Sequence, residues 1–219
     1  QKAARITRDD AAKELKRVEH VGSALPEFAL LMRDQICAAV GVDAAALPYV
    51  AELMDLRPEQ SRWRVAVEKV LRGVGLRLLV PDQHYASVLR FVNETNMRGR
   101  LQLHHVRASA SGREAEPNTL AGKLFLVDPD HPCAAEAADV VAAAGDHICV
   151  DTPDVFPRFR RAVTDTGLYK DSDRLAIKDD RRALRPSEYI YQGDVAAKID
   201  ALTVDLGAAE EAYRQARRA

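Results

Sequence analysis

The sequence predicts a mixed body, of the α/β or α+β class, held between one helix at each end of the chain. Three observations predict it: an order of strands and helices that occurs twice, a heptad spacing of apolar residues near both ends, and a polar run between the two repeats. With 219 residues, 47% of them hydrophobic, the chain is long enough to bury a substantial core.

The repeat divides the middle of the chain into a first lobe, 47–107, and a second lobe, 119–191, with a flexible linker expected at 108–118. Each lobe is expected to run strand, helix, strand, helix, strand (βαβαβ). The landmarks fall nearly in register: Pro58 with Pro129, Val80 with Val150, and Val92 with Val163. Strands are expected at 50–56, 76–80, 100–106, 123–127, 147–150 and 174–178. Helices are expected at 58–72, 83–95, 132–144 and 155–163.

Apolar residues near both ends follow alternating steps of four and three, the spacing of a coiled-coil seam. In an ascending stub, 1–25, the seam runs through Ala4, Arg8, Ala11, Leu15, Val18, Gly22 and Leu25. In a returning stub, 192–219, it runs through Val195, Ile199, Leu202, Leu206, Ala209, Tyr213 and Ala216. Because so narrow a stripe cannot bury itself alone, the stubs are expected to pair antiparallel. The alternative is a lone C-terminal helix that docks on the body.

A capping helix and its connector are predicted at 26–46. Pro26 fits the first turn of a helix, where its missing N–H costs nothing, and Gly41 fits its end. Between them, Phe28, Leu31, Met32, Ile36, Ala39 and Val40 follow helical spacing. This helix is therefore expected to cover the lobes.

Charge is balanced overall but not between the lobes. Lys and Arg number 32 against 33 Asp and Glu, so the chain is not a polycation that binds any polyanion. From 47 to 106 there are nine bases against six acids, and from 119 to 190 ten against thirteen, which gives +3 and −3. The basic residues predicted to contact a DNA backbone are Arg62, Arg64, Lys69, Arg72, Arg77, Arg98 and Arg100. The alternative is an ordinary solvated face, and few aromatic residues accompany these bases.

Sites of chemistry are not indicated. The run from Ala121 to Leu124 lacks the first glycine and the Ser or Thr of a phosphate loop, and Cys133 has no second cysteine to complete a zinc signature. We therefore expect no catalytic residue, no metal and no cofactor. Three widely spaced cysteines suit a reducing cytosol, and no apolar run is long enough to span a membrane. The first residues contain neither Met nor a signal-peptide core, so a fragment of a longer protein is expected.

Several short phrases carry a resemblance to a known family. They are Leu47-Pro48-Tyr49-Val50-Ala51-Glu52-Leu53, then Arg57-Pro58-Glu59, Trp63, Leu71-Arg72-Gly73 and Leu78-Leu79-Val80-Pro81, with Ser187 to Asp194 before the returning stub. Together they resemble the hinge of MukB-like SMC proteins, and more closely the MksB/JetC/EptC branch of bacterial condensin-like and Wadjet plasmid-defence systems. The resemblance covers nearly the whole chain and is strongest from Leu47 to Val106.

The resemblance implies a hinge that joins two coiled-coil arms, forms a homodimer and touches DNA weakly and without sequence preference. The parent would be a cytoplasmic, nucleoid-associated ATPase of chromosome organisation or plasmid defence, whose ATPase heads lie outside this chain. One departure is that the second lobe has only Gly122, Gly145 and Gly167, whereas SMC hinges cluster glycines at their dimer surfaces. The opposite lobe charges suggest that the basic lobe of one copy faces the acidic lobe of the other. The alternatives are a docking platform for a protein partner, such as a topoisomerase or a defence-system component, and a small α/β nucleotide-binding enzyme.

Overall fold

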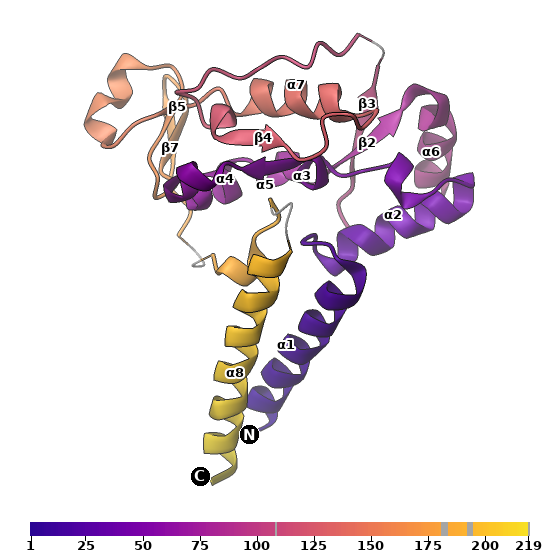
Figure 1. Cartoon of the computed structure of the whole chain (residues 1–219), viewed down its shortest axis with the longest axis vertical. Coiled ribbons are helices and arrows are strands. Elements are labelled where there is room, and N and C mark those ends of the chain that lie inside the picture. Colours follow the sequence, from indigo (N-terminus) through magenta and orange to yellow (C-terminus); the bar gives the residue numbers. More distant parts are fainter. Residues whose placement is uncertain (108, 181–183, 192–194, 219) are drawn as a thin grey trace.

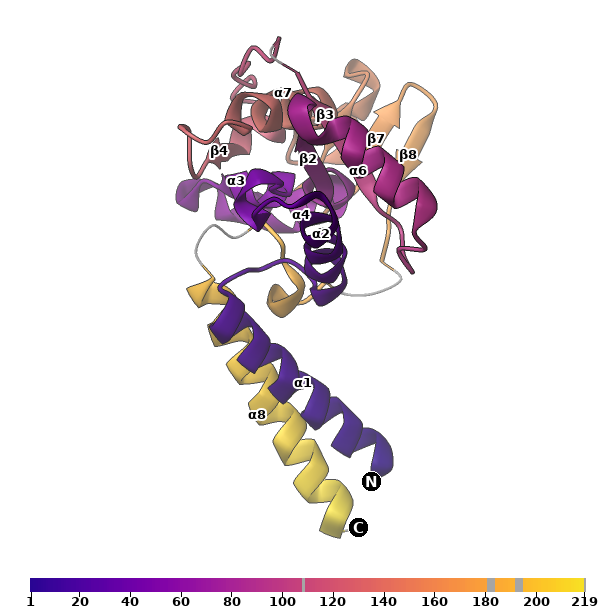
Figure 2. The ribbon, with the colours of Figure 1, turned by 90° about the vertical axis from the view of Figure 1, so that its right-hand side faces the viewer.

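The chain forms a mixed α/β body on a two-helix stalk (Figure 1). This computed structural model describes residues 1–107, 109–180, 184–191 and 195–218. Both chain ends lie together at the far end of the stalk, as the second view also shows (Figure 2). The mixed fold class expected from the sequence is confirmed.

The stalk is an antiparallel pair of helices, α1 (Lys2–Val21) and α8 (Ala196–Arg218), as the heptads predicted. Val18 and Leu202 are buried, and the other seam residues on the two helices are partly buried. Arg8, which interrupts the apolar seam, places its guanidinium 4.6 Å from the centre of the Tyr213 ring, a cation–π contact. Gly22 ends α1 in a left-handed conformation (φ 66°), with its N–H bonded to the Val18 carbonyl.

Helix α2 (Glu27–Val40) crosses beneath α6 (Asp82–Glu94) at the stalk side of the body. Pro26 precedes α2 as its N-cap instead of opening it, and Gly41 ends it at φ 72°. The helix buries half of its apolar residues, among them Met32 and Ile36, but Phe28 and Leu31 are 49% and 54% exposed. The capping helix thus keeps an apolar strip in solvent.

The first lobe differs from its expected order at the start, where residues 50–53 are helical. Tyr49 N–H donates to the Glu52 carboxylate (2.8 Å), and this capping interaction turns the chain into a helix before the strand begins. The lobe contains α3 (Val50–Leu53), β1 (Met54–Leu56), the 3₁₀ helix η2 (Pro58–Trp63), α4 (Arg64–Val70), α5 (Arg72–Gly75), β2 (Arg77–Pro81), α6 and β3 (Gln102–Val106). A further 3₁₀ turn, η1 (Ala44–Ala46), precedes the lobe.

The second lobe differs most where a helix was expected at 155–163. Those residues form part of a 3₁₀ helix and then a strand, because Pro157 has no N–H to continue a helix. The lobe contains η3 (Ala121–Lys123), β4 (Leu124–Leu126), α7 (Ala134–Ala144), β5 (Ile148–Cys149), η4 (Pro153–Arg158), β6 (Ala162–Val163), β7 (Tyr169–Ser172), β8 (Leu175–Ile177) and η5 (Pro186–Glu188). Strand β7 was not expected from the sequence.

The repeat survives in the sheets as one parallel strand pair per lobe, β2 with β3 and β5 with β6. The landmark that matched Val92 with Val163 is wrong, because the first lies in α6 and the second in β6. Strands β7 and β8 extend the second sheet antiparallel, and β1 pairs antiparallel with β4. The last pairing joins the lobes directly, with Asp55 opposite Phe125.

The main hydrophobic core draws on both lobes, with Leu78, Leu79 and Val80 of β2 fully buried beside Ala137 and Val141 of α7. A small second cluster, Val150, Phe156 and Ala162, lies beneath η4. The division of the chain into separate lobes and stubs remains a prediction.

Two alanine substitutions on α8, one in the stalk seam and one outside it, should lower the stability of the fold by different amounts. Leu202→Ala removes a side chain that is 5% exposed, and we expect it to lower the free energy of unfolding by about 2–4 kcal/mol. Val204→Ala, at a position that is 72% exposed, should change it by less than about 0.5 kcal/mol. Urea denaturation followed by circular dichroism measures both, and equal losses would show that the seam does not contribute.

Candidate functional site

The place where the stalk enters the body, here called the arm root, is organised by the buried carboxylate of Glu68. Glu68 lies on helix α4 and is completely buried. Its Oε1 accepts hydrogen bonds from the N–H groups of Ile190 (2.9 Å) and Tyr191 (3.0 Å). Its Oε2 lies 3.6 Å from Arg72 Nη1. Burial raises the pKa of this carboxyl, while these hydrogen bonds and Arg72 act in the opposite direction.

The segment whose N–H groups donate these hydrogen bonds is fixed at further points. Tyr191 is fully buried, and its hydroxyl donates to the Leu71 carbonyl (2.8 Å). A Cβ at Gly75 would come within 2.8 Å of the Tyr191 ring, so only glycine permits this approach. Arg64 donates to the Tyr191 carbonyl and Arg72 to the Glu188 carbonyl (2.9 Å). The chain leading to the returning helix is therefore bound to α4 and α5 through its backbone.

Lys198 ties the two stalk helices to this segment. It lies in the first turn of α8, is 3% exposed, and donates to the carbonyls of Ala24 and Tyr189. Burial lowers the pKa of Lys198 to about 8. Arg17 on α1 donates to the Leu25 carbonyl (2.9 Å), and so the ends of α1 and α8 meet at one polar cluster.

Four of the basic residues predicted to bind DNA are held by partners within the chain. Arg64 and Arg72 belong to the arm root, as described above. Arg62 pairs with Asp151, and Lys69 pairs with Asp180 (2.9 Å), so both link the basic lobe to the acidic lobe of the same molecule. Part of the charge difference between the lobes is thus neutralised internally.

The other three, Arg77, Arg98 and Arg100, form no ion pair among the residues that the structure describes. Arg98 and Arg100 are exposed on the loop between α6 and β3, whereas Arg77 is partly covered on β2. Arg98 has a left-handed backbone (φ 51°), unusual for a residue other than glycine, and its N–H donates to Asn96 Oδ1 (3.0 Å). The seven basic residues predicted to bind DNA therefore divide into four that have partners within the chain and three that form no ion pair among the described residues.

The histidines on β3 contact different elements. His104 bonds to Glu136 of α7 (2.6 Å), across the two lobes, whereas His105 bonds to Asp82 (2.7 Å) and stacks on Tyr85. Among the described residues no cluster of three or more His, Cys, Asp or Glu could hold a metal ion.

The cysteines are free thiols. Burial raises the pKa of Cys133 to about 11 and of Cys149 to about 12, so neither provides an activated thiolate at neutral pH.

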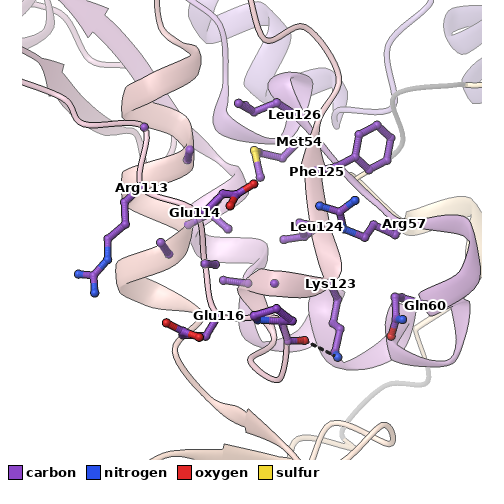
Figure 3. Close-up of a pocket in the computed structure, with 18 of the residues that line it drawn as sticks. Met54, Arg57, Gln60, Arg113, Glu114, Glu116, Lys123, Leu124, Phe125 and Leu126 are labelled. Carbon is purple, nitrogen blue, oxygen red and sulfur yellow. Dashed lines mark hydrogen bonds between the residues drawn. The ribbon is translucent and has the colours of Figure 1, made fainter.

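A large pocket lies between β4, helix α7 and the extended segment 112–117 (Figure 3). It has a volume of about 660 Å³ and a mixed lining. Lys123 closes one side by donating to the Pro117 carbonyl (2.7 Å), while Arg113 points away from the pocket (Figure 3). We find no nucleophile paired with a base among its described lining residues.

The comparisons with known proteins concern the fold. The Pyrococcus furiosus SMC protein hinge domain aligns over 81% of this chain and 91% of its own, with a TM-score of 0.52 and 16% identity. The Geobacillus stearothermophilus SMC hinge domain, solved as an asymmetric dimer, aligns over 99% and 89%, with a TM-score of 0.52 and 15% identity. In the folded elbow of cohesin the alignment covers 97% of this chain but 30% of the other, with a TM-score of 0.56 and 10% identity. The chain therefore has the fold of an SMC hinge domain.

No family model and no curated protein sequence matches the chain. Within the described residues no helix has the length and apolar character needed to cross a membrane.

Sequence reasoning missed Glu68, Tyr191 and Lys198 as the residues that join stalk and body. A signal existed in the spacing of Arg64, Glu68 and Arg72, which places alternating charges on one helix face at steps of four. That pattern is also typical of a solvated helix face, and only the fold shows that the returning segment covers it.

The arm root predicts that Glu68 acts as a hydrogen-bond acceptor whose ionisation opposes folding. Glu68→Ala leaves two buried N–H groups without a partner, and we expect it to lower the free energy of unfolding by about 3–5 kcal/mol. Glu68→Gln keeps one acceptor oxygen and should cost less than half as much. Because the folded pKa is raised, wild type should gain stability relative to Glu68→Gln as the pH falls from 7, levelling off below the ordinary value of 4.5.

Chemical denaturation at several pH values measures this series. Glu94→Gln, at an exposed position on α6, is the matched control and should follow the wild-type profile. Parallel pH profiles for wild type and Glu68→Gln would contradict the assignment.

Proposed function

We propose that this chain is the hinge of an SMC-like protein, where two coiled-coil arms meet and two copies associate. One observation carries the proposal: α1 and α8 leave the body side by side and antiparallel, from a root made of buried hydrogen bonds. The similarity of the fold to SMC hinge domains supports it. A joint of this kind transmits the position of the body to both arms at once.

We propose that the homodimer forms at a sheet edge. Strand β8 is the outer strand of the second sheet, and Leu175 on it is 49% exposed. An apolar edge strand with free backbone groups is a template for pairing with another chain. The glycines of this lobe are less suited, since Gly145 packs on Ala121 and Gly167 on Lys69 of the same chain.

A dimer through β8 is weakened by a charge on its edge. Light scattering with size-exclusion chromatography should give the mass of two 24.2 kDa chains at micromolar concentration. We expect Leu175→Lys to raise the dissociation constant about tenfold or more, because it removes an apolar contact and adds repulsion between copies.

The control is Val204→Lys, which adds the same charge at an exposed site on the stalk and should leave the mass unchanged. A single-chain mass for wild type at every concentration would remove the dimer proposal. A dimer that dissociates in high salt but tolerates Leu175→Lys would instead favour the pairing of basic and acidic lobes between copies.

We also propose weak DNA binding without sequence preference, through the exposed pair Arg98 and Arg100, with Arg77 beside them. Arginine binds phosphate in two-point geometry, and these residues have no carboxylate partner among the described residues to compete with it. Arg62, Arg64, Lys69 and Arg72 were part of the same prediction, and their internal partners leave them with a smaller expected share.

Reversing the exposed pair tests the DNA contact. With a mixed-sequence duplex at low salt, the Arg98→Glu and Arg100→Glu double variant should bind at least about tenfold more weakly, with a shallower dependence on salt. Fluorescence anisotropy measures both quantities, and Arg160→Glu, on an exposed residue of the acidic lobe, is the control. Equal loss in the control, or no binding by wild type at low salt, would contradict the proposal.

The parent protein, we propose, is a cytoplasmic ATPase of the MukB, MksB, JetC and EptC kind that acts at the nucleoid in chromosome organisation or plasmid defence. The phrases from Leu47 to Pro81 support this finer assignment. Plasmid loss and chromosome segregation, measured after deletion of the parent gene, distinguish the two roles.

A further inference from the structure

A second, mainly apolar pocket lies beneath the first turns of α2. It has a volume of about 380 Å³, enough for one large side chain, and is lined mostly by apolar groups that include Phe28, Met32, Leu76 and Leu101. Phe28 and Leu31, three residues apart on α2, extend this apolar surface into solvent. Exposed apolar groups beside a preformed pocket are typical of a binding site for a protein segment.

The walls of the pocket are held rigidly by the fold. The Tyr49 hydroxyl donates to the Ala29 carbonyl (2.7 Å), which fixes Tyr49 against α2. On the opposite wall the end of the Met32 side chain lies against Gly99, where a Cβ would displace it. Because the hydrogen bond of Tyr49 is in place before binding, that wall loses little conformational entropy when a ligand enters.

One cation lies in the lining of the pocket. Arg100 is the single charged residue in its described lining. Gln102 orients it: with the amide nitrogen donating to the Gly73 carbonyl (3.0 Å), the amide oxygen accepts from Arg100 Nη2 (3.0 Å). The remaining N–H groups of the guanidinium are left to bind an anion.

Two acidic residues of α2 and α3 are paired with bases of the same chain, and Asp34 of α2 is an acid whose charge acts on Tyr49 in the pocket wall. Glu27 pairs with Lys13, and Glu52 pairs with Arg33. Arg98, exposed on the same loop as Arg100, adds a second positive charge. The pocket therefore combines an apolar cavity with a positive edge.

We propose that this pocket binds an acidic protein segment, inserting one aromatic or large apolar side chain beside Met32 while a neighbouring carboxylate pairs with Arg100. A carboxylate meets guanidinium in two-point geometry, and an aromatic anchor in an enclosed pocket is the usual centre of such an interface. This proposal does not depend on dimer formation or on the stalk.

The methionine methyl groups report on this pocket directly. Of the chain's three methionines, Met32 lines this pocket, Met54 lines the larger one, and Met97 lies in the loop near Arg98. The full chain is labelled with ¹³C-methyl methionine and titrated with indole-3-propionate, which carries an aromatic ring and a carboxylate. Tryptamine, with the same ring and an ammonium group, is the matched probe.

We expect indole-3-propionate to shift the Met32 resonance with a dissociation constant on the order of 1 mM, and to leave Met54 unmoved. Tryptamine should bind at least about fivefold more weakly, because its charge opposes Arg100. Gly73→Leu adds a bulky side chain to the pocket lining at a position where a Cβ meets nothing within 4 Å, and should weaken or abolish the shift. Arg100→Glu should reverse the preference between the probes, whereas Arg90→Glu on exposed α6 should not.

Circular dichroism establishes that each variant is folded, and Arg100→Gln replaces Arg100→Glu if the latter is not. The proposal is overturned if Met32 does not respond to indole-3-propionate, if both probes shift it equally, or if Arg100→Glu leaves the preference intact. It is also overturned if an eight-residue oligothymidine shifts Met32 at lower concentration than indole-3-propionate, which would assign the pocket to a nucleic-acid base.

Discussion

The joint depends on one buried carboxylate. Glu68 has lost its hydration, and an isolated charge in that position would cost several kcal/mol. It persists because two backbone N–H groups, those of Ile190 and Tyr191, donate to it and Arg72 lies beside it. The same bonds fix the point at which the chain leaves the body. Since Lys198 then binds the carbonyl after α1, the position of one stalk helix sets the position of the other.

This arrangement explains why the stalk forms with a modest seam. Among the described seam residues that lie on α1 and α8, only Val18 and Leu202 are buried, and short helix pairs with so little burial are marginal by themselves. The body supplies what the seam lacks, because it holds the two helices together at one end and so makes their pairing an intramolecular event. Far from the arm root, the cation–π contact between Arg8 and Tyr213 adds a second point at which α1 and α8 are held together.

The sequence predicted what depends on periodicity and failed where single contacts override it. The heptads predicted the antiparallel stalk, and the residue pattern predicted strands near β2 and β3, whereas their parallel pairing came only from the structure. Residues 50–53 were missed because the Glu52 carboxylate caps a helical turn, and 155–163 because Pro157 interrupts a helix that its neighbours favour. The arm root needed the fold itself, since Glu68 and Ile190 are 122 positions apart in sequence.

The opposite net charges of the two lobes are used partly for ion pairs within one chain. Opposite charges on two lobes suggest attraction between copies, yet Arg62 and Lys69 reach Asp151 and Asp180 within one chain. An intramolecular partner is present at a high effective concentration, so it is satisfied before a second molecule arrives. Arg98 and Arg100, exposed on the loop between α6 and β3, form no ion pair among the described residues, and Arg100 lines an apolar pocket. Folding thus uses Arg62, Arg64, Lys69 and Arg72 for contacts within the chain and leaves Arg98 and Arg100 exposed.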